Sequence, residues 1–375
     1  MPAEANHLPI IEAEKLQMKF RRIDALRGVN LQVNRGSVFA LLGENGAGKS
    51  TLIRILTGFQ KPSDGSARVC GLDPARQPDQ VRRQIGYVSD APSLYPWMTV
   101  AETGGFAASL YDAAFLERYQ RSINAYEIRA DQKIKHLSKG QRAKVALSLA
   151  LAHDPSLLIL DEPTSGLDPK VRKSFLESMI DRAATGQTVF LSSHQISEVE
   201  RVADQVAILH RGKIVLVGAL DEIRDSVSRL VIDVDDPLRA IARLPAPATV
   251  LSEDTAGRQR QLFVRQLQPA MINALREQEG VTEVRHHSAT LEEIFVAYTL
   301  PSSESNSGDS NGGSDRRSDS DDDQGPPSDS GNVAGPGNAA DPRNTSDTGN
   351  STVRERNDGS VLTRGKERTG EVGAL

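Results

Sequence analysis

The sequence predicts an α/β fold: a mainly parallel β-sheet with helices on both faces. Short apolar segments such as 157–160 recur along the first part of the chain, and amphipathic helix-length stretches separate them. Because a strand covered on both faces is apolar at nearly every position, this alternation is typical of parallel sheets. Residues 92–137 show helix-like segments without a good strand and predict a helical insertion. A turn at 210–213 between two apolar runs predicts an antiparallel hairpin.

The predicted elements of the sheet follow one another in a regular order. A strand, a glycine-rich loop and a helix that closes at Gly58 come first, and strands and helices then alternate as far as residue 209. The expected strands are 38–42, 85–88, 157–160, 188–192 and 205–209, and the later expected helices are 141–152, 171–183 and 196–203. We assign this main domain to residues 10–227, after an N-terminal extension of residues 1–9.

A small α+β domain is expected over residues 228–300. Its predicted strands are 230–234, 249–252, 261–264 and 281–285, and its predicted helices are 269–278 and 291–299. Thr290 and Glu293 predict a capping box for the last helix. His286 and His287 are neighbours in a predicted strand, where successive side chains point to opposite faces, so a metal-binding pair is not expected.

Residues 301–375 have the composition of a disordered tail. Aromatic residues are absent there, and Ser, Asp, Gly and Asn dominate, so the segment cannot bury enough apolar surface to offset its chain entropy. It holds an acidic run at 319–323, and its end is basic. A solvated, mixed-charge tail is favoured over a partner-binding segment.

Composition excludes several classes of function. The formal net charge of −5 gives no reason to expect a nucleic-acid partner. Cys70 is the only cysteine, so the sequence offers neither an intrachain disulfide nor a multi-thiolate metal site, which suits a reducing cytoplasm. The amino end does not resemble a signal peptide, and no apolar run approaches the roughly 20 residues that span a bilayer. We therefore expect a chain that does not cross a membrane.

Residues 43–50 match the phosphate-binding pattern G-x-x-x-x-G-K-S in full, between a predicted strand and a predicted helix. Glycines let backbone amides turn toward a polyphosphate, and the helix amino end adds partial positive charge there. Lys49 is expected to neutralise the β- and γ-phosphates, and Ser50 to ligate Mg²⁺. The nucleotide-binding candidates of this loop are Gly43, Glu44, Asn45, Gly46, Ala47, Gly48, Lys49, Ser50 and Thr51. The alternative is a mere glycine turn before a helix.

Three further residues supply the chemistry of hydrolysis. Asp161 ends the apolar strand 157–160 and is expected to hold Mg²⁺, while Glu162 would polarise the attacking water as general base. Capping of a loop is the alternative role for these acids. His194 follows the strand 188–192 at the carboxyl edge, where open α/β sheets bind ligands. Alone it would be a structural histidine, but beside these carboxylates the catalytic role is favoured.

The ordered motifs resemble the ATP-binding cassette (ABC) family over residues 10–223. Residues 137–141 resemble its signature loop, with Lys139 where the family usually has glycine, and residues 165–168 match its D-loop. The resemblance implies a P-loop NTPase cassette, with a mainly parallel sheet, a helical insertion and an antiparallel β part, in which His194 is the switch histidine. Further nucleotide-binding residues implied are Phe20, Ser138, Lys139, Gly140, Gln141 and Asp168. Phe20 stands where the family stacks an aromatic on adenine, although a core position is an equal alternative.

Asp90 departs from the pattern, because the family normally places a glutamine there that contacts Mg²⁺ and senses the membrane partner. Aspartate is shorter, charged and only accepts hydrogen bonds. Contact with the metal is still possible, so Ser50, Asp90 and Asp161 form the candidate metal set. We expect Asp90 to keep a role in coupling to the partner.

The resemblance implies an ATPase that uses ATP and Mg²⁺ and pairs with a second cassette, so that Ser138 and Gly140 reach the γ-phosphate in trans. It also implies a separate membrane permease, contacted near Asp90 and residues 92–100, and thus a cytoplasmic protein on the inner face of the cell membrane. Residues 289–299 resemble the end of ATPase subunits of bacterial multidrug exporters. The alternatives are a soluble cassette acting on nucleic acid or ribosomes, and a degenerate cassette that binds ATP only as a signal.

Overall fold

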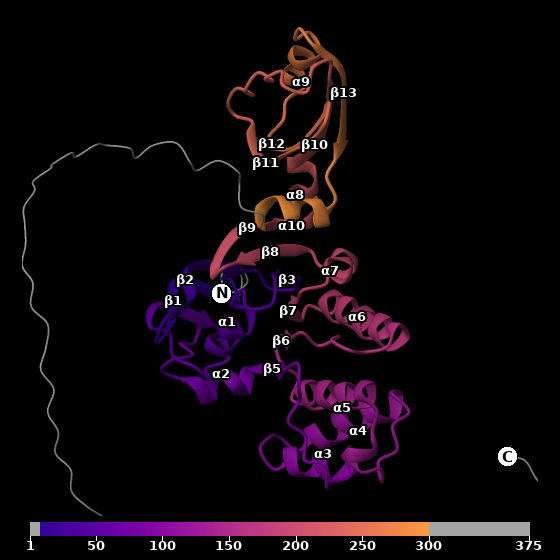
Figure 1. Ribbon diagram of the computed structural model, residues 1–375. Helices are drawn as coiled ribbons and strands as arrows, with labels where there is room; N and C mark the ends of the chain where they lie inside the picture. Colours follow the sequence, from indigo (N-terminus) through magenta and orange to yellow (C-terminus); the bar gives the residue numbers. More distant parts are fainter. Residues whose placement is uncertain (1–7, 300–375) are drawn as a thin grey trace, which may run out of the picture. The chain divides into compact units, whose positions relative to one another are not determined.

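The structure is a computed structural model that describes residues 8–299. The predicted disordered tail, 301–375, lies outside the described residues, as does most of the predicted extension, 1–9. Within the described part the chain forms three β-sheets and the helices that cover them (Figure 1).

The central sheet has six strands in the order β5-β6-β7-β3-β8-β9. Its strands are β3 (Val38–Leu42), β5 (Ile85–Val88), β6 (Leu157–Asp161), β7 (Thr188–Ser193), β8 (Gln205–His210) and β9 (Lys213–Ala219). The first five are parallel, and β9 returns antiparallel to β8 through the turn that the sequence predicted. The predicted parallel sheet is confirmed, and the carboxyl ends of β3, β6 and β7 lie side by side.

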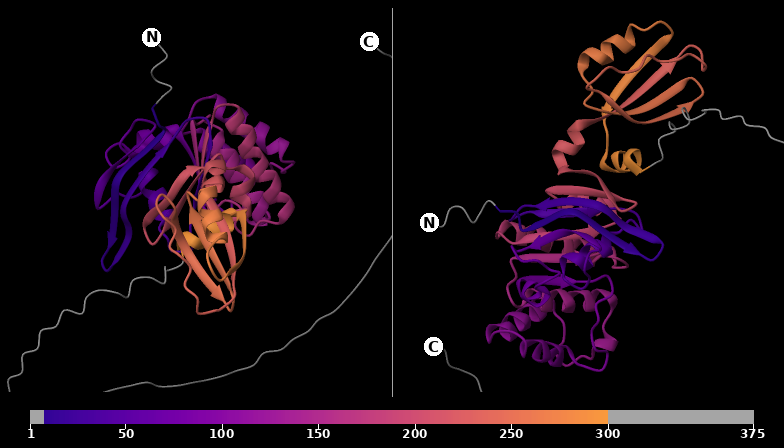
Figure 2. Two further views of the ribbon diagram at one scale, coloured as in Figure 1. Left: turned by 90° about the horizontal axis from the view of Figure 1, so that it is seen from above. Right: turned by 90° about the vertical axis from the view of Figure 1, so that its left-hand side faces the viewer.

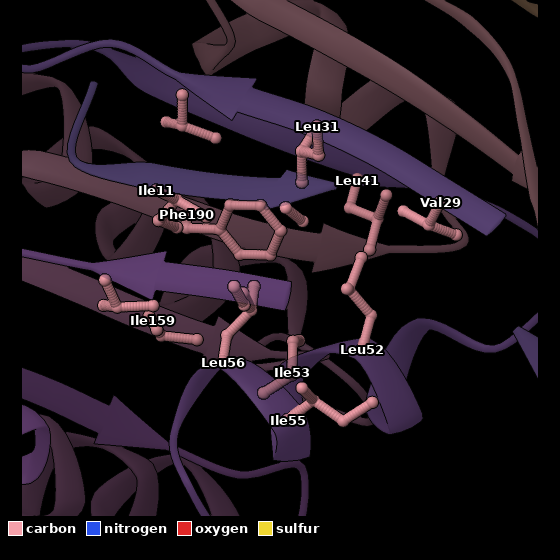
Figure 3. Close-up of a cluster of buried hydrophobic side chains, with 14 of the residues drawn as sticks. Ile11, Val29, Leu31, Leu41, Leu52, Ile53, Ile55, Leu56, Ile159 and Phe190 are labelled. Atoms are coloured by element: carbon pink, nitrogen blue, oxygen red, sulfur yellow. The ribbon is translucent and has the colours of Figure 1, made fainter. Parts of the chain in front are cut away.

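Helices cover both faces of this sheet, which explains why its strands are apolar throughout. On one face, α1 (Lys49–Leu56) packs against Leu41, Ile159 and Phe190 (Figure 3). On the other face, α5 (Lys139–Leu151) and α6 (Pro169–Ala184) pack against the alternate strand residues, such as Leu158 and Leu160. Helix α7 (Ile196–Val202) covers the neighbouring region around β8.

A three-stranded antiparallel sheet, in the order β2-β1-β4, flanks α1. None of its three strands was predicted from the sequence. The strands are β1 (Ile11–Phe20), β2 (Ile23–Val33) and β4 (Asp64–Val69). Register shifts interrupt β1 after Ala13, and Lys15 has a φ of 47°. Such bulges break the period-two pattern by which a strand is recognised. The short helix α2 (Pro78–Gln84) was also missed.

Residues 92–137, where a helical insertion was expected, contain α3 (Val100–Ala108), α4 (Ala114–Ala125) and a short 3₁₀ turn, Ile134–His136. Thr99 and Glu102 form a capping box at the start of α3. Tyr119 of α4 is buried, and its hydroxyl donates to the Val100 carbonyl at 2.8 Å. A Cβ on Gly104 would lie 2.2 Å from the Tyr119 ring, so this glycine lets α3 and α4 approach closely.

After β9, helix α8 (Leu220–Ser226) leads into a four-stranded antiparallel sheet in the order β11-β12-β10-β13. The remaining elements are β10 (Val227–Val234), β11 (Thr249–Ala256), β12 (Gln259–Arg265), α9 (Pro269–Arg276), β13 (Val281–Ser288) and α10 (Leu291–Thr299). Helix α9 covers one face of this sheet (Figure 2). The capping box of α10 is confirmed, since the Thr290 amide donates to Glu293 Oε2 at 3.0 Å and the Glu293 amide donates to Thr290 Oγ1 at 3.2 Å.

None of the helices in residues 8–299 has the length and apolarity that a membrane crossing requires. In the same part of the chain, no three His, Cys, Asp or Glu side chains gather into a ready metal site.

Candidate active site

The glycine-rich loop, residues 43–50, joins the end of β3 to the start of α1. A Cβ on Gly43 would lie 2.5 Å from the Leu209 carbonyl oxygen, and one on Gly48 would lie 2.6 Å from the Ala25 carbonyl oxygen. Gly48 also has a φ of 113°, which L side chains rarely adopt. The glycines are therefore needed to seat the loop against neighbouring backbone.

The side chain of Lys49 lies under this loop and is almost fully buried. Its ammonium group donates to the carbonyl oxygens of Gly43 at 2.6 Å and Glu44 at 3.2 Å. The same nitrogen lies 3.0 Å from Oε1 of Glu162. A cation is thus held at the centre of the loop, and a carboxylate is its counter-ion.

Asp161 and Glu162 stand at the end of β6, as the sequence predicted. Asp161 is 6% exposed, and its Oδ1 accepts a hydrogen bond from Ser192 Oγ at 2.7 Å. The Glu162 amide donates to Ser192 Oγ at 3.1 Å. Through these two hydrogen bonds Ser192, which was not among the predicted site residues, aligns both acids. Burial raises the pKa of the nearby Tyr87 phenol, and the negative charge of Asp161 raises that pKa further.

Glu162 has a φ of 50°, a left-handed conformation that is uncommon for a residue with a side chain and is often found at functional sites. Its Oε2 lies 2.7 Å from Nδ1 of His194, the residue that follows β7. Its Oε1 is buried and has no hydrogen bond in the described part of the chain, because the Lys49 contact is an ion pair without hydrogen-bond geometry. The structure thus brings together Lys49, Glu162 and His194 from three elements.

A cleft of about 490 Å³ opens beside this cluster. Nine of the predicted residues line it: Glu44, Asn45, Gly46, Gly48, Lys49, Ser50, Thr51, Asp90 and Glu162. The cleft is also lined by residues that the sequence reasoning missed: Ile23, Asp24, Ala25, Arg27, Arg211 and Gly212. The turn at 210–213 was recognised only as a hairpin, and its part in the site left no chemical signal in the sequence.

Several predicted residues do not line the cleft. Asp161, Gly43 and Ala47 are buried, and His194 reaches the cleft only through its contact with Glu162. Phe20 is 41% exposed and pairs with Ile23, a residue of the cleft, across the turn between β1 and β2. Its stacking on adenine stays a prediction.

The signature-loop residues lie apart from the cleft, at the start of α5. Ser138 caps this helix, because its Oγ accepts from the Gln141 amide at 3.1 Å and its own amide donates to Gln141 Oε1 at 2.9 Å. Asp168 caps α6 through the Val171 amide at 3.0 Å. Lys139 lines a second cavity, of about 370 Å³, to which Asp90 also contributes.

The residues of the main cleft fit a magnesium-bound nucleotide. Glu162 Oε1, which forms no hydrogen bond in the described part of the chain, and the Lys49 cation that pairs with it border the cleft. The hydroxyl of Ser50, the carboxylate of Asp90 and the buried carboxylate of Asp161 nearby are the hard oxygen donors that Mg²⁺ prefers. Magnesium is commonly bound by one or two carboxylates together with substrate phosphates, so the lack of a three-residue cage in residues 8–299 is consistent with such a site.

Comparison with known proteins identifies the family. A family model described as "ABC transporter" matches residues 26–165. The Nod factor export ATP-binding protein I of Cupriavidus pinatubonensis is 32% identical over 301 residues, covering 77% of this chain and 90% of that relative. The chain belongs to the ATP-binding subunits of ABC transporters. The matched length exceeds the predicted cassette, so the likeness extends beyond residues 10–227.

Solved structures agree with this assignment to the ABC family. The structure of an ATP-binding subunit of an ABC transporter is 34% identical, with a TM-score of 0.54, and covers 58% of this chain and 92% of its own. The dimeric structure of a bacterial ABC transporter cassette is 26% identical, with a TM-score of 0.51, over 56% and 98% of the two chains. ABC ATP-binding subunits are ATPases that power transport, and they work as dimers with membrane permease components. The predicted family, fold class and ATPase activity are confirmed.

Proposed function

We propose that this ABC subunit hydrolyses Mg·ATP in the cleft beside Lys49, with Glu162 as the general base. The observation that supports this proposal most directly is that one carboxylate contacts both the cation of the phosphate loop and His194. A carboxylate held in this way can accept a proton from water while the imidazole fixes its direction. Asp161, Ser50 and Asp90 would hold a magnesium ion, whose charge would offset the negative charge of the phosphates.

Nucleotide binding changes the partner of Lys49. In the structure, the ammonium group is paired with Glu162 at 3.0 Å, whereas a bound polyphosphate offers it a denser negative charge. When Lys49 turns to the phosphates, Glu162 loses this counter-ion and retains His194. The exchange would leave the carboxylate free to act on water only when nucleotide is present.

The site needs a second copy of the chain. Ser138, Lys139, Gly140, Gln141 and Asp168 do not line the cleft of their own subunit. In a pair of cassettes these residues would face the γ-phosphate bound by the other copy. The likeness to a dimeric bacterial cassette supports this arrangement, and a homodimer is the simplest form of it.

A groove of about 570 Å³ is the proposed seat of the permease. Leu110, 67% exposed, and Phe59, 59% exposed, line it, and Tyr87, Leu94 and Tyr111 add apolar surface. Ser89 and Pro92 also line it, directly beside Asp90. A segment of the permease that docks in this groove would thus contact residues next to Asp90, which lines the nucleotide cleft. This contact would couple the groove to the nucleotide cleft. The permease would hold the subunit at the inner face of the cell membrane.

Export is the proposed direction of transport. The likeness to the Nod factor export ATP-binding protein I supports this direction, because the match covers 90% of that protein's length. The transported substance would be recognised by the permease.

Phosphate release from Mg·ATP tests the hydrolytic proposal. The purified protein should release phosphate, and Glu162→Gln should lower the rate about a hundredfold or more, because general-base catalysis typically contributes 10²–10⁴-fold. Glu177→Gln is the matched control, since Glu177 lies on the exposed side of α6 and, among residues 8–299, forms an ion pair only with Lys173. Full activity of Glu162→Gln would reject the general-base role, and an inactive wild-type protein would support the degenerate cassette.

Co-purification tests the permease. The tagged protein should retain a multi-spanning membrane protein from detergent extracts, and Leu110→Glu should reduce its recovery about tenfold by placing a charge in the apolar groove. Leu238→Glu is the control, since Leu238 is 90% exposed outside the groove. Recovery of ribosomes or nucleic acid in place of a membrane protein would reject transport.

A further inference from the structure

Glu198 is a buried carboxylate that the hydrolytic proposal does not use. It lies on α7, four residues after His194, and is only 3% exposed. Its Oε2 accepts hydrogen bonds from Thr164 Oγ1 at 2.7 Å and from Ser193 Oγ at 3.2 Å. Ser193 also accepts from the Gln195 amide at 3.0 Å.

Arg172 of α6 is the counter-ion of this carboxylate. Its Nε lies 3.2 Å from Glu198 Oε1. The two atoms form an ion pair, but their geometry is not that of a hydrogen bond. The other two nitrogens of the guanidinium group each reach a loop. One donates to Gln195 Oε1 at 2.8 Å, and the other donates to the Leu167 carbonyl at 3.2 Å.

The contacts of this ion pair all fall beside the residues proposed to catalyse hydrolysis. Thr164 follows Glu162 by two positions, while Ser193 and Gln195 stand immediately before and after His194. Leu167 lies in the loop that ends at Asp168. One ion pair thus ties the loop after β6, which includes the segment 165–168 proposed to face the second subunit, to the loop after β7.

Desolvation makes a buried ion pair costly, and hydrophobic residues of similar size often stabilise a fold as well or better. Fold stability alone therefore does not explain why a carboxylate and a guanidinium group occupy this position. The hydrogen bonds to Thr164, Ser193 and Gln195 give another reason, because they fix the direction of loops that an apolar pair would leave free.

We propose that Glu198 and Arg172 are positioning residues that hold the Glu162 carboxylate and the His194 imidazole at their 2.7 Å separation. The pair also links this geometry to the 165–168 segment, so that a second subunit pressing on that segment acts on the catalytic pair. This inference rests on the proposed roles of Glu162 and His194. It assigns Glu198 and Arg172 no contact with the nucleotide.

The test compares two carboxylates of the same helix. Glu198→Gln removes the charge with little change in volume, whereas Glu200→Gln makes the same change at a residue that pairs with Arg224, away from the site. We expect Glu198→Gln to lower kcat about 10- to 100-fold with an ATP KM within about twofold of wild type, since small misplacements of reacting groups cost up to about 10²-fold. Glu200→Gln should retain wild-type kcat and KM.

Thr164→Val is the second variant, because it removes one hydrogen bond and leaves the ion pair with Arg172 in place. We expect its kcat to fall about three- to tenfold, in proportion to the loss of one of several restraints. Thermal unfolding of each variant gives the structural readout. A fall in kcat at an unchanged Tm supports positioning, and a fall in Tm at unchanged kcat for both variants overturns it.

A double variant shows whether Glu198 acts through the catalytic pair. In a His194→Ala background, Glu198→Gln should lower kcat less than about twofold further, because residues that act as a unit are strongly non-additive. A fully additive loss overturns the proposal. The two hypotheses fail differently: full activity of Glu162→Gln rejects the proposed function, whereas an inactive Glu162→Gln beside a fully active Glu198→Gln rejects only the positioning role.

Discussion

Oε2 of Glu162 lies 2.7 Å from Nδ1 of His194. The other oxygen of the same carboxylate lies 3.0 Å from the Lys49 ammonium group, so the proposed base bridges the histidine and the phosphate loop. We therefore expect the carboxylate to compete with nucleotide for Lys49.

This competition predicts that Glu162→Gln binds ATP at least as tightly as the wild-type protein, although it hydrolyses ATP poorly. An amide carries no charge, so the phosphates no longer have to displace a counter-ion from Lys49. Titration with a fluorescent ATP analogue should show a Kd that is equal or lower by up to about tenfold, which corresponds to about 1.4 kcal/mol. A Kd raised more than about tenfold would contradict the competition.

Lys49→Met should have the opposite effect on affinity. It removes the only buried cation that the loop presents to a phosphate, and we expect the Kd for ATP to rise at least about tenfold, the value of one charge-assisted contact. The same titration measures it. Lys173→Met is the control, since the Lys173 side chain is 64% exposed on α6, and an unchanged Kd for Lys49→Met would remove Lys49 from the nucleotide site.

His194→Ala should lower kcat more than it changes affinity. The imidazole contacts Glu162 rather than the phosphate loop, so its loss frees the carboxylate to turn without removing a binding contact. We expect kcat to fall about 10- to 100-fold, as for a lost orienting group, with KM changed by less than about threefold. Steady-state phosphate release gives both constants. A raised KM at normal kcat would make His194 a binding residue.

Much of this site could be predicted because each of its parts follows a buried strand. The apolar run before Asp161 and the glycine pattern before Lys49 indicate strand ends at one edge of the sheet, and both lie there in the structure. The positions of β1, β2 and β4 were missed because bulges interrupt the alternation of β1. Arg211 was missed as a cleft residue because a hairpin turn has the same sequence signature whether or not it borders a site.

Glu198 was also missed from the sequence. An acid within a helix indicates a solvated face more often than a buried one, and only the fold shows that Thr164, Ser193 and Arg172 surround it. Such a cluster joins two separate stretches of the chain, 164–172 and 193–198, so no local pattern could predict it.

Asp90 should affect coupling to the permease more than basal hydrolysis. It is exposed and lines both the nucleotide cleft and the cavity that contains Lys139. We expect Asp90→Ala to reduce permease-stimulated hydrolysis about tenfold, the loss typical of a removed charge contact. The basal rate should fall by a smaller factor, because Ser50 and Asp161 would still hold the magnesium ion. The two rates are measured with and without the permease in detergent. Unchanged stimulation would reject a coupling role for Asp90.

His153 should make the fold less stable in mild acid. Burial lowers the pKa of its imidazole, with Arg118 opposing protonation as well, although the Ile85 carbonyl 3.0 Å from Nε2 favours the charged form. As pH falls through the ordinary histidine pKa of about 6.5, the unfolded chain therefore takes up a proton that the folded chain resists, so the free energy of unfolding decreases. His153→Phe keeps a ring to stack on Tyr111, 4.7 Å away between centroids, and cannot titrate. Urea unfolding at pH 7.5 and pH 5.5 should show a larger loss of stability for the wild-type protein than for His153→Phe, and equal losses would show that His153 titrates alike in both states.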